Sequence, residues 1–389
     1  MDLPSKHVLH LSRKIGNRYA GSDGEKAAAS YILHAMEESD IDVVEESFSS
    51  WKSDLQGLAL IYLLAVLAYG IFPLNYMISL ALAIFVFLVF QMETYTWSVV
   101  SRLFPHSKAS NIVGRVRATE EVSQRVVVVA NYDSSRESPL GRPRIARMYR
   151  VLYTVSFICI VIIVLVSMLG VAASLAKVQR HTLFVIWIAI SPFTVYILVL
   201  FCSILWGEVF GRYTPGANDN ASGVGAMLSV LGSLVTNPLE HTEVWGVATA
   251  RGFAGGRGMA ALLRSRRYQI RDAFIINIDH PCGENTRVFT REGVMLGFHC
   301  SRRLQRIATR AARNSKGIEL GKGRCRVKKS DSMIALARGR KAITIGALTG
   351  GAYRGWRNRE DVYDEIDRDA LDRTVKLVQL MLDEIDQNG

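Results

Sequence analysis

The sequence predicts an α/β protein in which a mixed β-sheet flanked by helices is interrupted by two transmembrane helical hairpins. Outside the apolar regions, short β-branched runs alternate with helical stretches, as in sheets whose buried strands are joined by helices. Four long uncharged stretches fall in two pairs, and each is long enough to cross a bilayer. The 389-residue chain is 49% hydrophobic yet 21% charged, so its apolar residues are concentrated in these stretches.

The first apolar pair covers residues 55–72 and 76–92, which are separated by a short Pro-Leu-Asn corner. The second pair covers residues 151–176 and 183–206 and has a polar connector. At a helical rise of about 1.5 Å per residue, each stretch can span a hydrocarbon core of about 30 Å. Pro192 predicts a kink in the fourth span. We therefore expect a multi-pass membrane protein whose first partner is the lipid bilayer.

The hairpins divide one soluble peptidase-like domain into three segments. The expected segments of this domain are residues 1–54, 105–145 and 208–389, and the expected hairpins are residues 55–104 and 146–207. An even number of spans returns the chain to the same side, so the three soluble segments share one compartment.

The distribution of basic residues predicts which compartment this is. The net charge is +12. The soluble side of the spans carries Arg102, Lys108, Arg142, Arg144, Arg147 and Arg150, whereas the far side carries only Lys177 and Arg180. Lys and Arg accumulate on the cytoplasmic side of membranes, so the soluble domain is expected in the cytoplasm. The five cysteines form no CxxC pair, which fits free thiols in a reducing compartment. No nucleic-acid-reading module is present, and no nucleic-acid partner is expected.

The soluble segments show the elements of the predicted sheet. A Ser-Asp-Gly-Glu capping box opens a helix over residues 22–38. The other expected helices are 222–235 and 258–266, and the expected strands are 43–44, 111–116, 125–130, 244–248 and 274–279.

The most specific motif is Pro215-Gly216-Ala217-Asn218-Asp219-Asn220-Ala221-Ser222-Gly223. It resembles the signature of the M28 family of zinc aminopeptidases. Further segments resemble that family in the same order: 17–25, 110–114, 126–133, 274–279 and 359–363. The resemblance covers nearly all of the sequence outside the spans and implies a zinc-aminopeptidase-like sheet. It also implies two zinc ions, five ligand side chains and a catalytic Glu that takes a proton from the attacking water.

Carried over residue by residue, the resemblance implies that some of this metal site is kept. Asp219 matches the carboxylate that bridges the two ions, and Asp279 matches a later metal ligand. Asp133 matches the Asp that orients the first His ligand.

The other positions of the implied site carry different residues. Asn131 stands at the first His, Gly252 and Phe253 stand at the pair formed by the catalytic Glu and a Glu ligand, and Arg357 stands at the last His. Two of the five implied ligands remain, and no catalytic residue does. No small shift in register restores them, because no Glu follows Glu243 before residue 259 and no His follows His299.

The sequence therefore leans away from an enzyme. Two facing carboxylates are costly to bury without a cation, and Arg357 or Arg251 could supply the charge that zinc supplies in the family. We expect a site without a metal cofactor, with Phe253 filling volume, in a catalytically inactive protein with a binding or scaffolding role. A peptide or protein in the old cleft is the expected ligand.

Two alternatives keep zinc. One is an aminopeptidase or hydrolase with a single-metal or non-standard site, and the other is a standard aminopeptidase whose ligands lie elsewhere. His280, Cys282, His299 and Cys300 are metal-ligand types, although their spacing fits no standard zinc pattern.

A basic run near the C-terminal third also has two interpretations. It comprises Arg302, Arg303, Arg306, Arg310, Arg313, Lys316, Arg324, Arg326, Lys328 and Lys329. These side chains could cover an ordinary solvated surface, or they could dock on anionic lipid headgroups.

Overall fold

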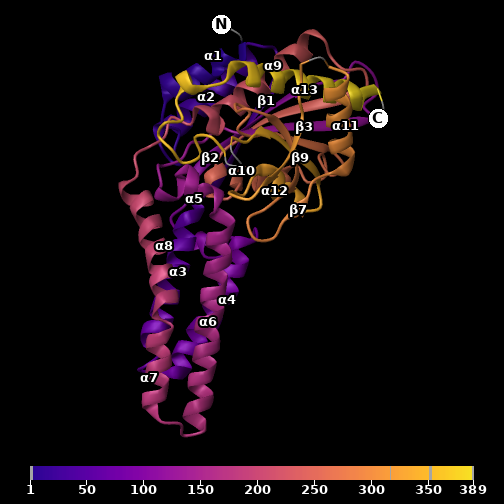
Figure 1. Cartoon of the computed structure of the whole chain (residues 1–389). Helices are drawn as coiled ribbons and strands as arrows, with labels where there is room; N and C mark the ends of the chain where they lie inside the picture. The colour runs from indigo at the N-terminus through magenta and orange to yellow at the C-terminus, as the bar shows by residue number, and fades with distance from the viewer. Residues whose placement is uncertain (1–2, 316, 350–352, 388–389) are drawn as a thin grey trace.

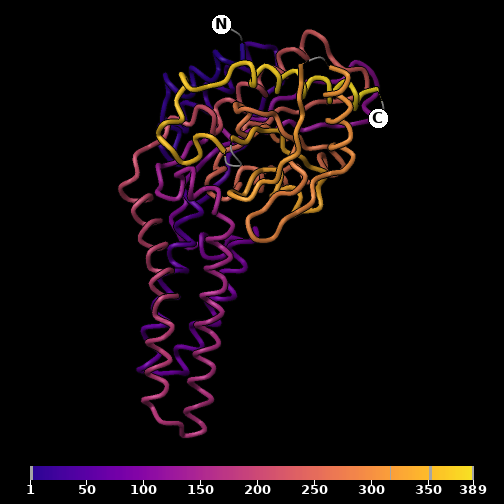
Figure 2. The backbone as a smooth tube through the Cα atoms, viewed as in Figure 1, coloured from indigo at the N-terminus to yellow at the C-terminus, as the bar shows by residue number. Residues whose placement is uncertain are grey.

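The protein, seen here in a computed structural model that describes residues 3–315, 317–349 and 353–387, consists of an α/β domain and a long helical bundle. The bundle projects from one side of the domain, and both termini lie on the opposite side (Figures 1 and 2). This arrangement agrees with the predicted fold class.

Within the described residues, nine strands form one mixed sheet in the order β1-β2-β4-β3-β5-β9-β6-β7, with β8 paired to β6. The strands are β1 (Asp42–Ser50), β2 (Ser107–Val116), β3 (Gln124–Asn131), β4 (Thr242–Thr249), β5 (Phe274–Ile278), β6 (Thr286–Glu292), β7 (Phe298–His299), β8 (Gly321–Cys325) and β9 (Lys341–Ala347).

The centre of the sheet is parallel. Strand β3 pairs in parallel with both β4 and β5, and β5 pairs in parallel with β9. Antiparallel pairs lie outside this centre, with β2 against β4 and β6 against β9. The carboxyl ends of the parallel strands meet at one edge of the sheet, which is where ligands bind in open α/β sheets.

Both faces of the central strands are buried, as their continuous β-branched sequences predict. Val126 and Val128 of β3 face one hydrophobic cluster, and Val127 and Val129 face another. The larger cluster is covered by helices α1 (Leu3–Leu9), α2 (Asp23–Glu37), α9 (Ser222–Thr236), α11 (Arg302–Arg313) and α13 (Arg368–Gln387), and the smaller one by α10 (Arg257–Ser265) and α12 (Asp331–Leu336).

The predicted capping box is present at the start of α2. Ser22 Oγ accepts a hydrogen bond from the backbone N–H of Glu25 at 3.2 Å. Glu25 Oε2 in turn accepts one from the backbone N–H of Gly21 at 2.7 Å. One backbone donor of the first turn and that of Gly21, just before the N-cap Ser22, are thereby satisfied, which fixes where the helix begins.

The bundle contains the predicted apolar stretches. Among the described residues, four helices are long and apolar enough to cross a membrane: α3 (Asp54–Ile71), α4 (Tyr76–Thr94), α6 (Tyr149–Leu175) and α8 (Ser191–Phe210). A short helix α5 (Pro143–Arg147) leads into α6, and α7 (Arg180–Ala189) precedes α8. The helix breaks at Ile190, two residues before Pro192, so the predicted kink is present.

Polar side chains join the helices of the bundle inside its apolar body. Tyr62 donates a hydrogen bond to Ser156 at 2.8 Å, and the hydroxyls of Ser79 and Ser167 lie 2.9 Å apart. Gly170 gives the ring of Phe72 room for close approach. Small residues and hydroxyl pairs of this kind hold helices together where the solvent is apolar.

Candidate functional site

The predicted site residues meet at the carboxyl edge of the parallel strands. Asn131 is the last residue of β3, Gly252 lies three residues beyond β4, and Asp279 follows β5 directly. Asp219 lies in a distorted turn, Ala217–Ala221, that precedes α9. Segments that are far apart in the sequence thus bring both predicted carboxylates to one buried point.

A lysine lies against the two carboxylates. Lys328 Nζ is 2.7 Å from Asp279 Oδ1 and 3.3 Å from Asp219 Oδ1. The His280 ring lies between the same two oxygens, with Nδ1 2.8 Å from Asp279 and Nε2 3.2 Å from Asp219. All four side chains are nearly or fully buried. Two acidic and two basic groups therefore share one small volume.

The electrostatics of this cluster favour its charged form. Burial raises the pKa of both Asp219 and Asp279, but His280 and Lys328 outweigh it and hold both pKa values below their usual range. Burial lowers the pKa of Lys328 and of His280, but the two carboxylates reverse this and raise both pKa values. Two negative and two positive charges then cancel, which removes much of the cost of burying each group alone.

Arg251 and Arg357, predicted from the sequence as the cation beside Asp219 and Asp279, pair with other acids. Arg251 is fully buried and pairs with Glu25 of α2, with Nε 2.9 Å from Oε1. Arg357 pairs with Asp54 at the start of α3, at 3.5 Å, and stacks over the ring of Phe253. Both arginines thus pair with acids other than Asp219 and Asp279. Lys328 is the cation that contacts these two carboxylates, where Arg251 or Arg357 was predicted.

The side chain of Asn131 fills the space that a side chain at position 252 would need. A Cβ atom added at Gly252 would lie 2.8 Å from Cγ and Nδ2 of Asn131, closer than real Cβ contacts allow. Asn131 Nδ2 also donates to Asp133 at 3.1 Å, and its Oδ1 accepts from Asn220 at 3.3 Å. A glutamate at position 252 would therefore require Asn131 to move and lose these bonds.

Asp133 fixes the loop after β4. Its two oxygens accept hydrogen bonds from the backbone N–H groups of Gly252 at 2.9 Å and Phe253 at 3.0 Å. Burial raises the pKa of Asp133, against the opposing effect of these hydrogen bonds. The family resemblance implies that Asp133 orients a His side chain. In this protein its carboxylate instead accepts hydrogen bonds from the backbone.

The space around these residues is almost full. A cavity of about 30 Å³ remains between Phe253, Lys328 and Arg357, which is room for about one water. Asp54 from the start of α3 and Tyr149 from the start of α6 line the same cavity. The helical bundle therefore forms one wall over the strand ends.

Residues that the sequence reasoning missed hold the Asp219 turn in place. Asp361 accepts hydrogen bonds from the backbone N–H groups of Asn218 at 2.7 Å and Asp219 at 2.9 Å. Arg18 is fully buried and donates to the backbone carbonyls of Pro215 and Gly216, among others. Arg18 and Asp361 lie in segments whose sequences resemble the family, but no sequence feature predicted that their side chains would hold the Asp219 turn.

Four other side chains of the kinds that bind metals were considered from the sequence, and of these only His280 lies beside Asp219, Asp279 and Lys328. Cys282 is buried, and its backbone N–H donates a hydrogen bond to Oδ1 of Asn218 at 3.0 Å. Cys300 lies 3.6 Å from the buried Glu292, and His299 is exposed on β7. Asp219, Asp279 and His280 each offer one ligand atom, and these atoms lie within 4.8 Å of one another.

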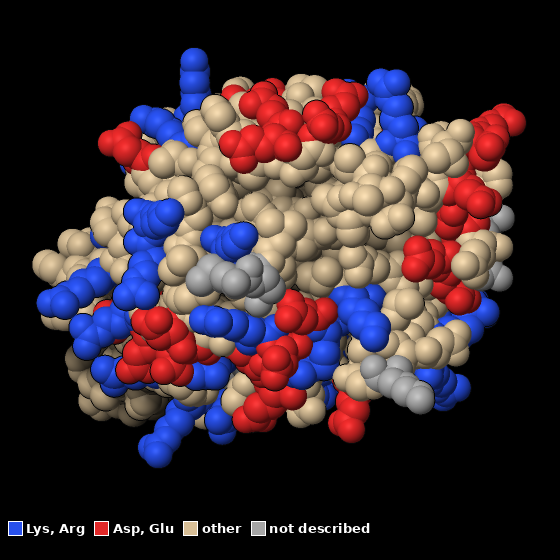
Figure 3. Space-filling model, turned by 90° about the horizontal axis from the view of Figure 1, so that it is seen from above, with Lys and Arg blue, Asp and Glu red and all other residues tan. Residues whose placement is uncertain are grey.

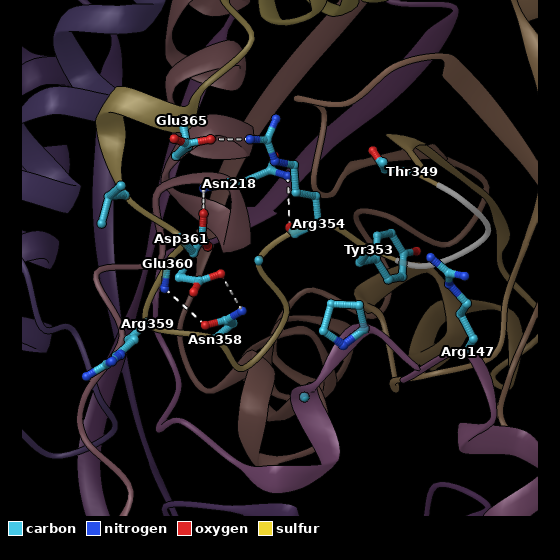
Figure 4. Close-up of a pocket in the computed structure, with 14 residues that line it drawn as sticks. Arg147, Asn218, Thr349, Tyr353, Arg354, Asn358, Arg359, Glu360, Asp361 and Glu365 are labelled. Atoms are coloured by element: carbon cyan, nitrogen blue, oxygen red, sulfur yellow. Dashed lines mark hydrogen bonds and ion pairs between the residues drawn. The ribbon is translucent and has the colours of Figure 1, made fainter. Parts of the chain in front are cut away.

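A larger pocket opens beside this cluster, shown in Figure 4. Its volume is about 660 Å³, and it lies between α5 and the segment from Tyr353 to Glu365. Asn218 and Asp361, which hold the Asp219 turn, contribute to its wall. Arg147, Arg354 and Arg359 contribute basic groups, and Arg354 pairs with Glu365.

The sheet order, the turn before α9 and the acids at the strand ends define an α/β domain of the zinc-aminopeptidase type. Residues 203–382 match the sequence model of Peptidase family M28, which confirms the predicted resemblance. No curated protein sequence matches the chain significantly.

Solved structures with the same fold include two aminopeptidases and a glutaminyl cyclase. A leucine aminopeptidase precursor from Bacteroides thetaiotaomicron superimposes with a TM-score of 0.55 at 15% identity, covering 98% of this chain and 96% of its own. A zinc aminopeptidase from Bacillus subtilis gives 0.56 at 14% identity, covering 98% and 94%. The glutaminyl cyclase of Porphyromonas gingivalis gives 0.58 at 13% identity, covering 99% and 98%. At these identities the likeness establishes the fold.

The described residues do not fit a pair of zinc ions. One His and two Asp side chains are gathered, short of the five ligands implied by the family resemblance. A single ion has three ligand atoms within reach, and Asp219 Oδ2 and Asp279 Oδ2 have no hydrogen-bond partner among the described residues. The Lys328 ammonium, however, contacts the other oxygen of both carboxylates.

Proposed function

We propose that this protein is a membrane-anchored M28-type domain that carries out no metallopeptidase chemistry and serves as a binding module. The observation that carries the proposal is the position of Lys328, whose ammonium lies 2.7 Å from Asp279 and 3.3 Å from Asp219. Its positive charge neutralises the carboxylates that would otherwise hold a metal ion. Lys328 thus does by ion pairing what zinc does in the aminopeptidases.

The neighbouring positions support the same function. Gly252 offers no carboxylate to take a proton from water, and Asn131 fills the space that such a side chain would need. The remaining cavity of about 30 Å³ is too small for an aminoacyl residue. A substrate therefore has no glutamate at the family's general-base position and little room beside the two Asp residues.

We place the ligand of this module in the adjoining pocket. Its volume of about 660 Å³ lies in the range of pockets that bind small molecules and peptide ends. Its wall carries exposed arginines and buried Asp361, so a peptide or protein segment with charged groups suits it. The spans α3, α4, α6 and α8 would hold the domain at the membrane, on the cytoplasmic side that the basic residues predict.

One observation favours a second function. Asp219, Asp279 and His280 converge, and each Asp keeps one oxygen without a hydrogen-bond partner among the described residues. If Lys328 swung out, these three side chains could hold one divalent ion and support a single-metal hydrolase.

A metal and activity measurement decides between the two functions. The full chain, purified in a neutral detergent, is expected to contain far less than one zinc per chain by mass spectrometry. It is also expected to release no product from aminoacyl chromogenic substrates with added zinc. A stoichiometric zinc ion, together with hydrolysis abolished by Asp219→Asn, would establish the hydrolase instead.

A further inference from the structure

Four arginines gather where the α/β domain meets the bundle. Arg150 lies in the first turn of α6, Arg291 lies on β6, Arg324 lies on β8, and Arg326 follows β8 closely. They line one small surface pocket, and all four side chains are exposed. None of them forms an ion pair with an acid among the residues that the structure describes.

The sheet holds these like charges together. Strands β6 and β8 pair in parallel with Arg291 opposite Arg324. Partial burial and then the repulsion of Arg150, Arg324 and Arg291 lower the pKa of Arg326. Like charges held side by side destabilise a surface unless an anion compensates them. The arrangement therefore indicates an anionic ligand from outside the chain.

Several other arginines of the domain are paired with acids. Arg125, Arg266 and Arg354 each pair with a glutamate. On the face turned away from the bundle, acidic and basic side chains are interspersed (Figure 3). The cluster of Arg150, Arg291, Arg324 and Arg326 lies on the side of the domain from which the bundle projects, beside the start of α6.

The cluster lies at the level where the helices would enter a membrane. Arg150 is the second residue of α6, and Tyr95 directly follows the end of α4. The Tyr95 ring lies 5.5 Å from that of Phe298, which ties β7, and the segment that leads into it from β6, to the end of α4. This segment hangs toward the bundle in Figure 1 and carries Leu296, which is 58% exposed. Trp97, beside Tyr95, is 54% exposed.

We propose that Arg150, Arg291, Arg324 and Arg326 bind the phosphate of an anionic phospholipid in the adjacent leaflet. This inference rests on the proposed membrane anchoring. The pocket holds only about 10 Å³, so the headgroup lies across the guanidinium groups rather than inside the pocket. Leu296 and Trp97 then lie at the boundary of the acyl region, where exposed apolar and aromatic side chains are stabilised. Guanidinium groups suit this ligand because they bind phosphate oxygens in pairs.

The basic helix that the sequence also offered for lipid docking lies elsewhere. Helix α11 packs Leu304 and Ile307 into the domain core and contacts α13, and in Figure 1 it lies on the domain away from the bundle. Arg310 of this helix pairs with Glu384 of α13. Lys316, which also belongs to that run, lies outside the described residues. Exposed Arg302, Arg306 and Arg313 of α11 therefore provide a charge-matched control.

The test measures thermal unfolding of the full chain in a neutral detergent while lipid is added. Phosphatidylglycerol, phosphatidylcholine and inorganic phosphate are titrated in parallel. The wild-type chain is expected to be stabilised by phosphatidylglycerol at concentrations at which the other two have no effect. In the R291Q/R324Q/R326Q variant, the half-saturating concentration of phosphatidylglycerol is expected to rise at least about tenfold, because three guanidinium contacts to the headgroup are lost. The R302Q/R306Q/R313Q control is expected to stay within about twofold.

Three results would overturn the headgroup site. These are equal stabilisation by both lipids, an unchanged response in the R291Q/R324Q/R326Q variant, or an equal response to inorganic phosphate, which would indicate a free-anion site. If the triple variant does not fold, the single R326Q variant replaces it, with an expected loss of about threefold. Anchoring is tested separately, because release of the chain from membranes by alkaline carbonate would contradict anchoring itself.

Discussion

Lys328 contacts one oxygen of Asp279 and one of Asp219, which leaves the second oxygen of each carboxylate without a partner among the described residues. An ammonium group carries one charge and three donors, whereas a zinc ion carries two charges and binds four ligands. His280 supplies the second positive charge when its ring is protonated, which the two carboxylates favour. At the scale of the residue, two nitrogen cations thus lie beside the two carboxylates.

Removal of Lys328 is expected to restore metal binding. In Lys328→Ala, the side chains of Asp219, Asp279 and His280 are left without the ammonium group, and three ligand atoms are open to one ion. We expect the variant to be destabilised by about 3–5 kcal/mol without metal, because it keeps buried charges that have lost their partner. Added zinc should then raise its Tm and be retained at up to one ion per chain.

Lys329→Ala is the matched control for this prediction. Lys329 is the next residue, but its ammonium donates to the backbone carbonyl of Glu93 at 2.7 Å and not to the two Asp side chains. The control should show no zinc-dependent rise in Tm. Equal zinc uptake by the wild-type chain would show that Lys328 does not exclude the metal.

The contact between Asn131 and Gly252 predicts how a small side chain would be tolerated. Gly252→Ala places a Cβ 2.8 Å from the Asn131 amide and should lower the free energy of unfolding by about 1–3 kcal/mol. Gly232→Ala, in helix α9 with nothing within 4 Å of the added atom, should be neutral or stabilising by up to about 1 kcal/mol. Denaturation of both variants beside the wild-type chain checks this. A harmless Gly252→Ala would mean that Asn131 moves freely.

At the scale of the element, strand β6 carries a buried acid that makes stability depend on pH. Glu292 is fully buried at the end of β6, beside Ser330 and Cys300. Burial raises the pKa of Glu292 to about 7 from an ordinary 4.5, and the hydroxyls of Ser330 and Thr344 counter this only in part. The folded state therefore holds the proton more tightly than the unfolded state.

This difference sets the sign of the pH dependence. The contribution of Glu292 is fully present below about pH 4.5 and is lost as pH rises through 7, by up to about 3 kcal/mol. Glu292→Gln keeps a neutral side chain of the same size. It should be more stable than the wild-type chain at pH 8, and it should lose this advantage at pH 5. Tm values of both proteins at the two pH values test this, and a constant difference between them would contradict it.

Elements with a strong local pattern were predicted from the sequence, and contacts between distant segments were not. Strands β3 and β5 were predicted because their β-branched runs are buried on both faces, and α2 because its capping box is local. Asp219 and Asp279 were placed together by their motif and by the end of a strand. Lys328 was seen only as a member of a basic run, because its contact depends on how the segment between β8 and α12 crosses the strand ends.

The pairing of Arg251 shows the same limit. The charge pattern offered it as a partner for Asp219, but Glu25 of α2 is the acid that meets it inside the domain. Glu25 was recognised only as a member of the capping box of its helix. Glu25 caps its helix with one oxygen and pairs with distant Arg251 through the other. The sequence pattern predicts the first role, whereas the second depends on how distant segments pack.

At the scale of the whole molecule, the bundle and the strand ends are joined by an ion pair, a hydrogen bond and a shared cavity wall. Arg357, beside the strand ends, pairs with Asp54 at the start of α3. Ser53 donates to Glu208 at the end of α8 at 2.9 Å, and Lys329 donates to the last turn of α4. These contacts place the strand ends toward the bundle, so a membrane there would limit access of large substrates to them.

The proposed cytoplasmic orientation is tested by labelling on either side of the membrane. Cys202, the exposed cysteine in α8, is first replaced by serine, because the other four cysteines are buried. A new cysteine at exposed Gln179, between α6 and α7, should react with a membrane-impermeant maleimide in intact cells. One at exposed Asn314, after α11, should react only after permeabilisation. This pattern follows because Arg142, Arg144, Arg147 and Arg150 oppose only Lys177 and Arg180 across the spans. The reverse pattern would place the domain outside and contradict the orientation inferred from charge. Labelling of both sites in intact cells would contradict a membrane crossing by α8.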